Sequence, residues 1–378
     1  MLYKVKETKN YRKTNILFGL ISIKTKYTDL SSIVRVLGLE ILTFKILNGK
    51  LQIQFNIKIP LPFIDKDKTN AKLLVKWAKK NYSKDFDSIF TFYGSPSGET
   101  YIILNILNSL LAKNGSQKPL LVVDKPFKYE LCKMFQPNIP VVLCKDLPFL
   151  YFKNTTIHKL KDCTVYSFFP TAHYLKQDVL INAEGEHYYS YITKALDLSR
   201  EQDFITIESS NSVKEKVAKF ISDNKLDKFV IISPEANTCS EDCVNWEKIC
   251  NGLKDEGFDV VLNVQNMKNY IPNTIPVFLP YEEMLELTKF ASAFLGLRSG
   301  LVEILSQNTR YTPFYVLYSA FPERGLLKAM DSEKALSGFS LKKLPNVNAE
   351  NVFECEVDKI EEKDILDEIF NKLFSKVR

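Results

Sequence analysis

The stretch Phe294-Leu295-Gly296-Leu297-Arg298-Ser299-Gly300-Leu301-Val302-Glu303 places an apolar strand directly before the start of a helix. Such a turn delivers Arg298, Ser299 and Gly300 to a helix N-terminus, where backbone N–H groups and the helix dipole attract anions. A guanidinium at the same point adds a planar set of donors. The stretch therefore predicts an anion site, with Glu303 one turn further on and placed to accept a hydrogen bond from a ribose hydroxyl. The alternative is an N-cap serine beside a surface arginine.

Strand and helix patterns alternate on the N-terminal side of this stretch as well. Largely apolar runs at residues 88–93 and 229–233 predict strands, and helical patterns follow at residues 101–113 and 246–256. Runs of this kind are typical of strands that are buried on both faces of a parallel sheet. The chain is therefore expected to be an α/β protein with two Rossmann-like units in tandem. We place the division between these units near residues 198–210.

The first 64 residues have a different pattern. Residues 17–23 and 36–42 each have two apolar residues before Gly-Leu and an Ile within the next three positions, and residues 51–57 alternate strictly. Alternation with period two is typical of half-buried strands. The sequence thus predicts a β-rich N-terminal addition, to which we assign no chemistry.

Composition narrows the function classes. The 378 residues carry 51 Lys and Arg against 45 Asp and Glu, a net charge of +6, and 45% of them are hydrophobic. This excludes a disordered chain and a disulfide-stapled miniprotein. Only 3 His and 13 Gly are present, which argues against a histidine-rich metal enzyme and against a glycine-rich phosphate loop.

The seven cysteines are scattered without a CxxC pair, so we expect free thiols in a reducing cytoplasm. Cys239, Cys243 and Cys250 are close in sequence, but no histidine near them offers a fourth zinc ligand. We therefore expect no metal site.

No run of 18 apolar residues is present, so no membrane-spanning helix is predicted. We expect a cytoplasmic protein. Contact of the basic first 26 residues with the inner face of the cytoplasmic membrane is one possibility, and a solvated strand pair is the other.

Two further loops follow predicted strands. Ser233, Glu235 and Asn237 carry polar side chains that could hydrogen-bond a phosphate or a sugar hydroxyl, although such residues also serve as ordinary helix caps. Glu99 precedes a strongly apolar helix and could act as a general base that deprotonates a hydroxyl. The alternative for Glu99 is a first-turn carboxylate that the helix dipole favours.

Several of these motifs together resemble a known family. The strand that ends in Ser233-Pro234, the helix from Trp246, the stretch Gly257-Phe258-Asp259-Val260-Val261 and the stretch 294–301 are similar to the nucleotide-sugar domain of GT-B glycosyltransferases. The similarity is to heptosyltransferase-like enzymes of bacterial lipopolysaccharide and capsule assembly, over about residues 88–320.

One of the family's motifs is matched and another is altered. The family's Gly-Asp pair at the start of the first helix is similar to Gly98-Glu99. Its final loop usually reads Asp-Thr-Gly followed by His, whereas this chain has Arg298-Ser299-Gly300. The identity of the sugar donor therefore does not carry over.

The resemblance implies a GT-B fold of two facing Rossmann-like domains. It assigns acceptor binding to residues 1–205, of which 1–64 are the addition, and donor binding to residues 206–355, with a helix at 356–378 that could cross back. The implied activity is inverting, metal-independent transfer of a sugar from a nucleotide-diphosphate donor to a hydroxyl of a bacterial surface polysaccharide or lipid-linked glycan. No cofactor is implied.

The resemblance also gives each candidate residue a role. Glu99 would be the catalytic base, and Lys268 would assist Arg298 in stabilising the departing diphosphate. The donor would contact Ser233, Glu235, Asn237, Arg298, Ser299, Gly300 and Glu303. The acceptor would contact Ser97, Gly98, Thr100 and His173.

Two other readings stay open. A nucleotide-sugar epimerase can use the same two-domain cleft, but it would need more acid and base residues than the three histidines supply. A nucleic-acid-binding protein would fit the basic charge, but the lysines are interleaved with acidic residues and no basic helix stands out, so we expect no nucleic-acid partner. The pairs Asp65/Asp67 and Asp85/Asp87 match the short DxD metal pattern, and we expect neither pair to bind a metal.

Overall fold

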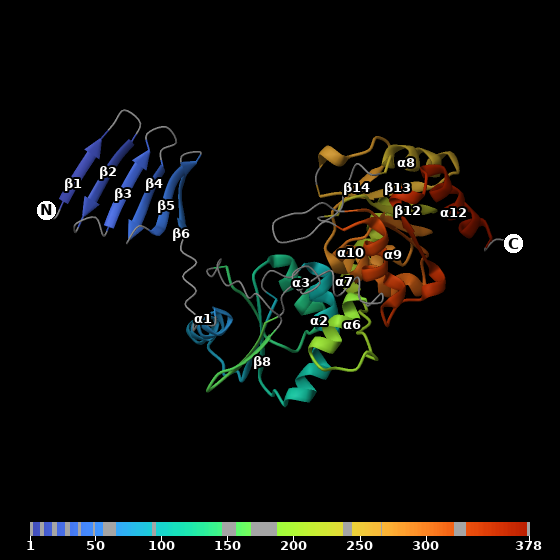
Figure 1. Cartoon of the computed structure of the whole chain (residues 1–378). Helices are drawn as coiled ribbons and strands as arrows, with labels where there is room; N and C mark the ends of the chain where they lie inside the picture. Colours follow the sequence, from blue (N-terminus) through green and yellow to red (C-terminus); the bar gives the residue numbers. More distant parts are fainter. Residues whose placement is uncertain are drawn as a thin grey trace. The chain divides into compact units, whose positions relative to one another are not determined.

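A computed structural model describes residues 3–7, 11–16, 21–26, 31–36, 39–47, 50–55, 66–92, 96–145, 156–167, 187–236, 244–265, 267–320 and 330–375 (Figure 1). The chain divides into two units, Met1–Asp65 and Lys66–Arg378, and each unit is described by itself below.

The first unit is an antiparallel sheet whose six strands pair in sequence order. The strands are β1 (Tyr3–Glu7), β2 (Tyr11–Ile16), β3 (Ile21–Lys26), β4 (Ser31–Val36), β5 (Leu39–Leu47) and β6 (Lys50–Phe55). The register shifts once, between Val34 and Arg35 where β4 pairs with β5. The predicted β-rich addition is thus confirmed as a six-stranded meander.

The second unit begins with a five-stranded sheet in the order β10-β11-β7-β8-β9. The strands are β7 (Ser88–Thr91), β8 (Pro119–Val123), β9 (Val141–Leu143), β10 (Thr156–Lys159) and β11 (Thr164–Ser167). All neighbours are parallel except β10 and β11. The helices of this half are α1 (Lys66–Asn81), α2 (Ser97–Asn114), α3 (Pro126–Phe135) and α6 (Tyr188–Ala195).

The C-terminal half of the second unit contains a six-stranded, wholly parallel sheet in the order β14-β13-β12-β15-β16-β17. Its strands are β12 (Phe229–Ser233), β13 (Asp259–Asn263), β14 (Ile275–Val277), β15 (Ala293–Leu297), β16 (Phe314–Tyr318) and β17 (Val352–Glu356). Its helices are α7 (Asn211–Asp223), α8 (Trp246–Asp255), α9 (Tyr281–Thr288), α10 (Gly300–Leu305), α11 (Ser332–Phe339) and α12 (Glu362–Ser375). Short 3-10 segments are η3 (Met267–Asn269), η4 (Ser306–Arg310), η5 (Leu341–Lys343), η6 (Ala349–Asn351) and η7 (Val357–Lys359). The predicted α/β class is confirmed.

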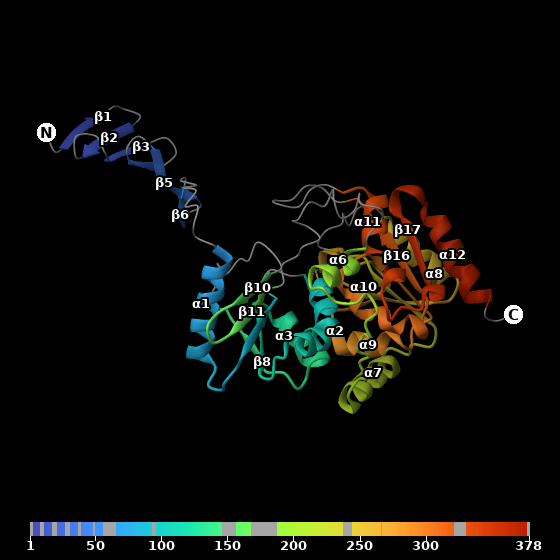
Figure 2. The same ribbon diagram turned by 60° about the horizontal axis from the view of Figure 1, so that its bottom comes forward.

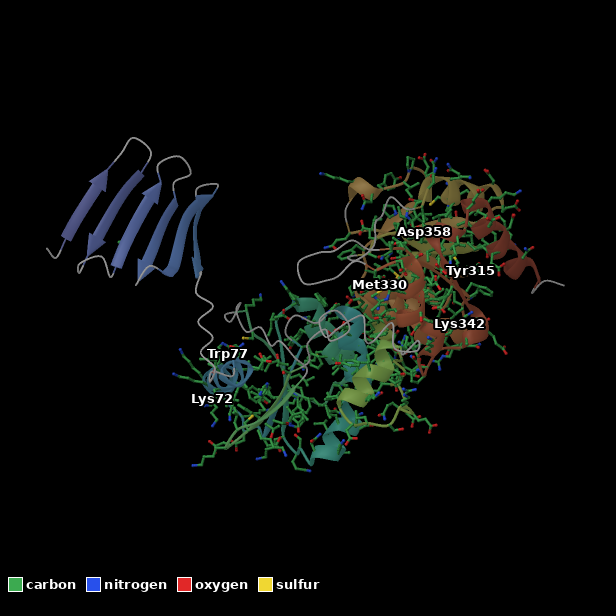
Figure 3. All side chains as sticks on the ribbon, in the orientation of Figure 1. Lys72, Trp77, Tyr315, Met330, Lys342 and Asp358 are labelled. Atoms are coloured by element: carbon green, nitrogen blue, oxygen red, sulfur yellow. The ribbon has the colours of Figure 1, made fainter. Side chains whose placement is uncertain are left out.

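The apolar strands account for the core. Every residue of β12, β15 and β16 is buried, as expected for strands with helices on both faces of the sheet. One face packs against α8 and α12, where Ile365 and Ile369 join the cluster around Ile249. Tyr315 of β16, which is labelled in Figure 3, stacks on Phe353 of β17 with ring centroids 4.9 Å apart. The C-terminal helix, as far as it is described, packs on the second sheet.

The first sheet is covered in the same way. Helix α1 lies beside one face of the sheet (Figure 2). Its residues Ala71, Leu74 and Ala78 pack against strand residues there. On the other face, α2 and α3 belong to a larger cluster that continues into the helices of the second sheet. This shared cluster joins the two halves of the unit, so the helices between them position the candidate site.

Candidate functional site

The order of the second sheet marks where a ligand is expected to bind. Numbered from β12, the order is 3-2-1-4-5-6, the order of dinucleotide-binding folds. The strand order reverses between β12 and β15, because β13 and β14 follow on one side of β12 while β15, β16 and β17 follow on the other. Open α/β sheets bind ligands beyond the carboxyl ends of the strands at that point. Ser233 ends β12, and Arg298 follows β15 directly. Two of the three predicted loops therefore flank this switch point.

The first sheet has a switch point of its own, between β7 and β11. Helix α2 is the next described element after β7 and begins at Ser97, with Glu99 in its first turn. The third predicted loop therefore occupies the same place in the first sheet that Arg298-Ser299-Gly300 occupies in the second.

The structure brings these two helix starts into direct contact. A Cβ atom added at Gly98 would overlap the carboxylate of Glu303 and lie 3.2 Å from the Cα of Gly300. A Cβ atom at Gly300 would overlap the Ser97 hydroxyl and lie 2.6 Å from the backbone nitrogen of Gly98. Both positions need glycine because no space is left for a side chain. The two switch points therefore meet at Gly98 and Gly300.

Two carboxylates lie buried at this contact. Glu99 is 4% exposed and Glu303 is 1% exposed. Glu303 forms an ion pair with Arg298, and the Arg298 guanidinium lies 4.1 Å from the centroid of the Phe339 ring and 5.7 Å from that of Tyr188. A stacked, paired guanidinium of this kind is strongly oriented. In this structure Glu303, the predicted acceptor from a ribose hydroxyl, is the partner of Arg298.

Burial sets the protonation of both acids. It raises the pKa of Glu99 to about 8, and the nearby Glu303 carboxylate adds to the rise, while Arg298 and Lys128 oppose it. Burial also raises the pKa of Glu303, against the attraction of Arg298. Glu99 therefore holds its proton at neutral pH while the contact is closed. A carboxyl group with a pKa near the working pH can both take up and release a proton.

Lys128 is a site residue that the sequence analysis did not identify. It is 1% exposed, and its Nζ atom donates to the Phe92 carbonyl oxygen at 2.7 Å and to Asp124 at 2.6 Å. The Phe92 carbonyl lies just beyond the end of β7, so Lys128 braces the chain that leads to Glu99. The sequence around Lys128 reads as one turn of an amphipathic helix, and no local pattern separates it from a surface lysine.

Tyr188 is a second residue that the sequence analysis missed. It is 4% exposed, and it comes from α6, far from Arg298 in sequence. Its neighbour His187 caps α6 by accepting from the Tyr189 backbone N–H at 3.3 Å. Burial lowers the pKa of His187 to about 3, so this imidazole is neutral across the physiological range.

Three of the other predicted site residues, Thr100, Ser233 and Glu235, form hydrogen bonds within the chain. Thr100 is fully buried, and its hydroxyl donates to the Pro96 carbonyl oxygen at 2.8 Å. The buried Ser233 hydroxyl accepts from the Asn263 side chain at 3.1 Å. Glu235 accepts from the Gln265 backbone N–H and from the Asn269 side chain, each at 2.8 Å. Glu235 thereby ties the loop after β12 to the loop after β13. Asn237 and His173 lie outside the described residues.

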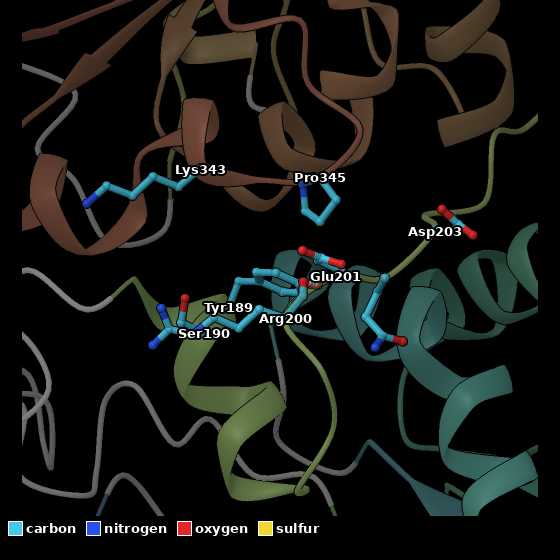
Figure 4. A pocket seen from close by; sticks show the side chains of 8 residues that line it. Tyr189, Ser190, Arg200, Glu201, Asp203, Lys343 and Pro345 are labelled. Atoms are coloured by element: carbon cyan, nitrogen blue, oxygen red, sulfur yellow. Dashed lines mark hydrogen bonds between the residues drawn. The ribbon is translucent and has the colours of Figure 1, made fainter.

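Two hollows open near these elements. A volume of about 360 Å³ lies beyond the ends of β12 and β13 and is lined by Glu235, Trp246 and the exposed Lys268, among others. A volume of about 640 Å³ separates α6 and the chain after it from η5. In Figure 4, Tyr189, Ser190 and Arg200 lie on one side of the larger hollow, and Lys343 and Pro345 lie on the other.

Over the described ranges, no cluster of three or more His, Cys, Asp or Glu could hold a metal ion. Asp87 of the second DxD pattern accepts from the Ser116 hydroxyl at 2.7 Å and from the backbone N–H groups of Gln117 and Lys118. Asp87 therefore braces the turn before β8.

The cysteines that the structure describes are free thiols. In the same part of the chain, no helix is long and apolar enough to cross a membrane.

Neither a protein-family model nor a curated protein sequence matches the chain. Solved structures do match, and a glycosyl transferase of family 9 from Veillonella parvula is one of them. It is 11% identical with a TM-score of 0.47, over 77% of this chain and 97% of that one. The ADP-heptose lipopolysaccharide heptosyltransferase II of E. coli is 13% identical with a TM-score of 0.45, over 77% and 100%. The E. coli heptosyltransferase WaaC with ADP is 10% identical with a TM-score of 0.41, over 76% and 98%.

Proposed function

We propose that this chain is a glycosyltransferase that moves a sugar from a nucleotide-diphosphate donor to an acceptor hydroxyl. One observation carries the proposal: two α/β switch points meet at Gly98 and Gly300, and one contributes the buried carboxyl group of Glu99 while the other contributes the guanidinium of Arg298, whose side chain is 13% exposed. Inverting sugar transfer can use both groups, a base for the attacking hydroxyl and a cation for the leaving diphosphate.

The donor is assigned to the second sheet. Arg298, the amides of Ser299 and Gly300, and Lys268 would stabilise the diphosphate as negative charge develops on it. Glu303 would orient Arg298 or a ribose hydroxyl, and Ser233, Glu235 and Asn237 would line the rest of the donor site. The hollow of about 360 Å³ beside Glu235 has the size of a small-molecule subsite.

The acceptor is assigned to the first sheet. Its hydroxyl oxygen attacks the anomeric carbon, the bond from that carbon to the phosphate oxygen breaks, and the hydroxyl proton passes to Glu99. Displacement in one step inverts the anomeric configuration. Ser97, Gly98, Thr100 and His173 would surround the acceptor.

Substrate access would require the Gly98–Gly300 contact to open. Water would then reach Glu99, and its pKa would fall from about 8 toward the ordinary value for a glutamate. Opening therefore converts Glu99 from a proton-bearing acid into a base. The electrostatic groups on the donor side supply the stabilisation that other transferases obtain from a divalent metal.

The finer assignments follow the sequence analysis. Residues 1–205 would carry acceptor binding and residues 206–355 donor binding, with the acceptor a bacterial surface polysaccharide or a lipid-linked glycan. Work on a lipid-linked acceptor would place the enzyme at the inner face of the cytoplasmic membrane.

The first test measures donor binding and turnover. Nucleotide-diphosphate sugars should raise the melting temperature of the protein, and addition of an acceptor glycan should release free nucleoside diphosphate. No shift with any such donor would contradict the proposal. A product that keeps its nucleotide would instead indicate an epimerase.

Variants then separate the two roles. Glu99→Gln should lower turnover by about 10²–10⁴-fold and leave the donor-induced melting shift intact. Glu215→Gln, on the exposed side of α7, is its control. Arg298→Ala should weaken donor binding. Arg310→Ala is the matched control, because Arg310 also lies over an aromatic ring, 4.7 Å from the centroid of Tyr311, but is exposed.

A further inference from the structure

The six-stranded sheet of the first unit has one face on which apolar residues predominate. Directly opposed residues in an antiparallel sheet share a face, and faces alternate along each strand. The register therefore places one set of mostly apolar residues together on this face, which we call the apolar face. Its apolar members are Tyr3, Val5, Ile16, Ile21, Ile23, Val34, Val36, Leu39, Leu42, Phe44, Ile46, Leu51, Ile53 and Phe55.

The opposite face, which we call the basic face, has the reverse character. The same register places Glu40 there as its acidic residue, opposite Arg35. The basic residues on this face are Lys4, Lys6, Lys13, Lys24, Lys26, Arg35, Lys45 and Lys50. The sheet is therefore strongly amphipathic.

A sheet with one apolar face must bury that face against another layer. Between Tyr3 and Phe55, the described elements are strands, and they form a single sheet, so this unit supplies no second layer from its described residues. Six strands at about 4.8 Å spacing and about 20 Å long give a flat footprint of roughly 500–600 Å². Apolar patches of that size mark interaction sites.

We infer that the apolar face binds the apolar face of a second copy of this chain, so that two sheets form a β-sandwich between protomers. A twofold axis lets the same surface serve on both partners. Two facing sheets would cover roughly 1,100 Å² even as flat footprints, which exceeds the roughly 1,000 Å² expected of a biological interface. Face-to-face packing of two antiparallel sheets is a common way to build a core.

The charge distribution favours a second copy over a membrane. In a sandwich the two basic faces point outward on opposite sides, where water solvates the lysines. On an anionic bilayer the same sheet would bury its apolar face and hold its positive charges away from the lipid headgroups. The attraction between basic residues and anionic lipid would then be largely lost.

The second unit offers no matching apolar surface over the residues described for it. Its large exposed apolar side chains are spread over α1, α3, β10 and the loops after β14 and α9, as with Leu73, Tyr129, Ile157, Phe278 and Phe290. Isolated exposed residues of this kind are normal on protein surfaces. A second copy supplies a surface of the required size and character.

The first experiment measures the mass of the full chain in solution by light scattering. We expect twice the mass of one chain at micromolar concentration, unchanged at 1 M salt because the contact is apolar. The mass of a single chain would overturn the inference. If a protein with the mass of a single chain also sediments together with vesicles of phosphatidylcholine and phosphatidylglycerol, the partner of the apolar face is a membrane instead.

Two adjacent substitutions on β4 then test the faces. Val34→Lys places a charge on the apolar face and should reduce the mass to that of one chain. Ile33→Lys makes the same kind of change on the basic face and should leave the doubled mass. A doubled mass in Val34→Lys would overturn the inference.

A photo-cross-linking experiment covers the case in which Val34→Lys fails to fold. With p-benzoylphenylalanine in place of Phe44, on the apolar face, ultraviolet light should yield a covalent product of two chains. The same group in place of Lys45, on the basic face, should yield none. Cross-links from position 44 that stay within one chain would overturn the inference.

Discussion

The two switch points of the second unit have the same backbone plan but different charges. After β15, Arg298 and Glu303 lie five residues apart and neutralise each other within one strand–helix connection. After β7, the connection supplies Glu99 alone, and the positive charges that act on it come from Arg298 and from Lys128 on α3. The connection after β15 is self-contained in the sense that its buried acid, Glu303, has its positive partner within the same connection. The connection after β7 is not, because the positive charges that act on Glu99 come from other elements. A buried carboxyl group whose charge is only partly balanced by nearby positive groups has a shifted pKa, and such groups are favoured for acid–base chemistry.

The largest expected effect comes from breaking the self-contained side. Glu303→Ala leaves the Arg298 guanidinium, whose side chain is 13% exposed, without its carboxylate, and should lower the free energy of unfolding by about 3–5 kcal/mol. Urea denaturation measures the change. Glu208→Ala is the control, because its 65% exposed side chain also pairs with an arginine and should cost about 0–1 kcal/mol. Equal losses in the two variants would contradict the assignment.

A smaller effect is expected from separating the two sides. Gly98→Ala would press a methyl group onto the Glu303 carboxylate and should lower the free energy of unfolding by about 1–3 kcal/mol. In Gly252→Ala the added Cβ lies 2.6 Å from Leu366 Cδ1, the mobile end of a side chain, so the strain is relieved more easily. Urea denaturation of both variants compares them. A Gly98→Ala protein as stable as Gly252→Ala would show that the contact is loose.

The pH dependence of stability reports on the side that is not self-contained. The pKa of Glu99 is raised to about 8 in the folded protein, so the folded state binds an extra proton between about pH 4.5 and pH 8. Its contribution to stability is present below that window and is lost as pH rises through 8.

Between pH 7 and pH 8, the wild type should therefore lose roughly 1 kcal/mol more than Glu99→Gln, which has no proton to release. Thermal unfolding at a series of pH values measures the difference. Parallel curves for the two proteins would mean that Glu99 is ionised in the folded state.

The smallest expected effect concerns Lys128, one of the two positive residues that lower the pKa of Glu99 from other elements. Lys128→Met removes a positive charge that lowers the pKa of Glu99, so the alkaline loss of stability should move upward by less than about one pH unit. Lys133→Met, on the exposed side of the same helix, should leave the midpoint unchanged. The double variant Lys128→Met/Glu99→Gln should show no alkaline loss, which ties the shift to Glu99.

The sequence analysis located the strand ends but not the relations between them. The runs at residues 229–232 and 294–297 contain no polar side chain, so their burial and the residues that follow them could be predicted directly. Lys128 and Tyr188 could not, because α3 and α6 show no pattern that separates a buried lysine or tyrosine from its neighbours. Their place in the site depends on helices that are distant in sequence.

The sequence by itself determined the class of the fold, the β-rich first unit and the loops at the carboxyl ends of β7, β12 and β15. It did so because strand and helix periodicity and the chemistry of turns are local properties of the chain. Only the tertiary structure decided that Gly98 meets Gly300, that Arg298 is held by Glu303, and that the pKa of Glu99 is raised. These features depend on burial and on charges brought together from separate halves of the unit, and a local sequence pattern carries no information about such distances.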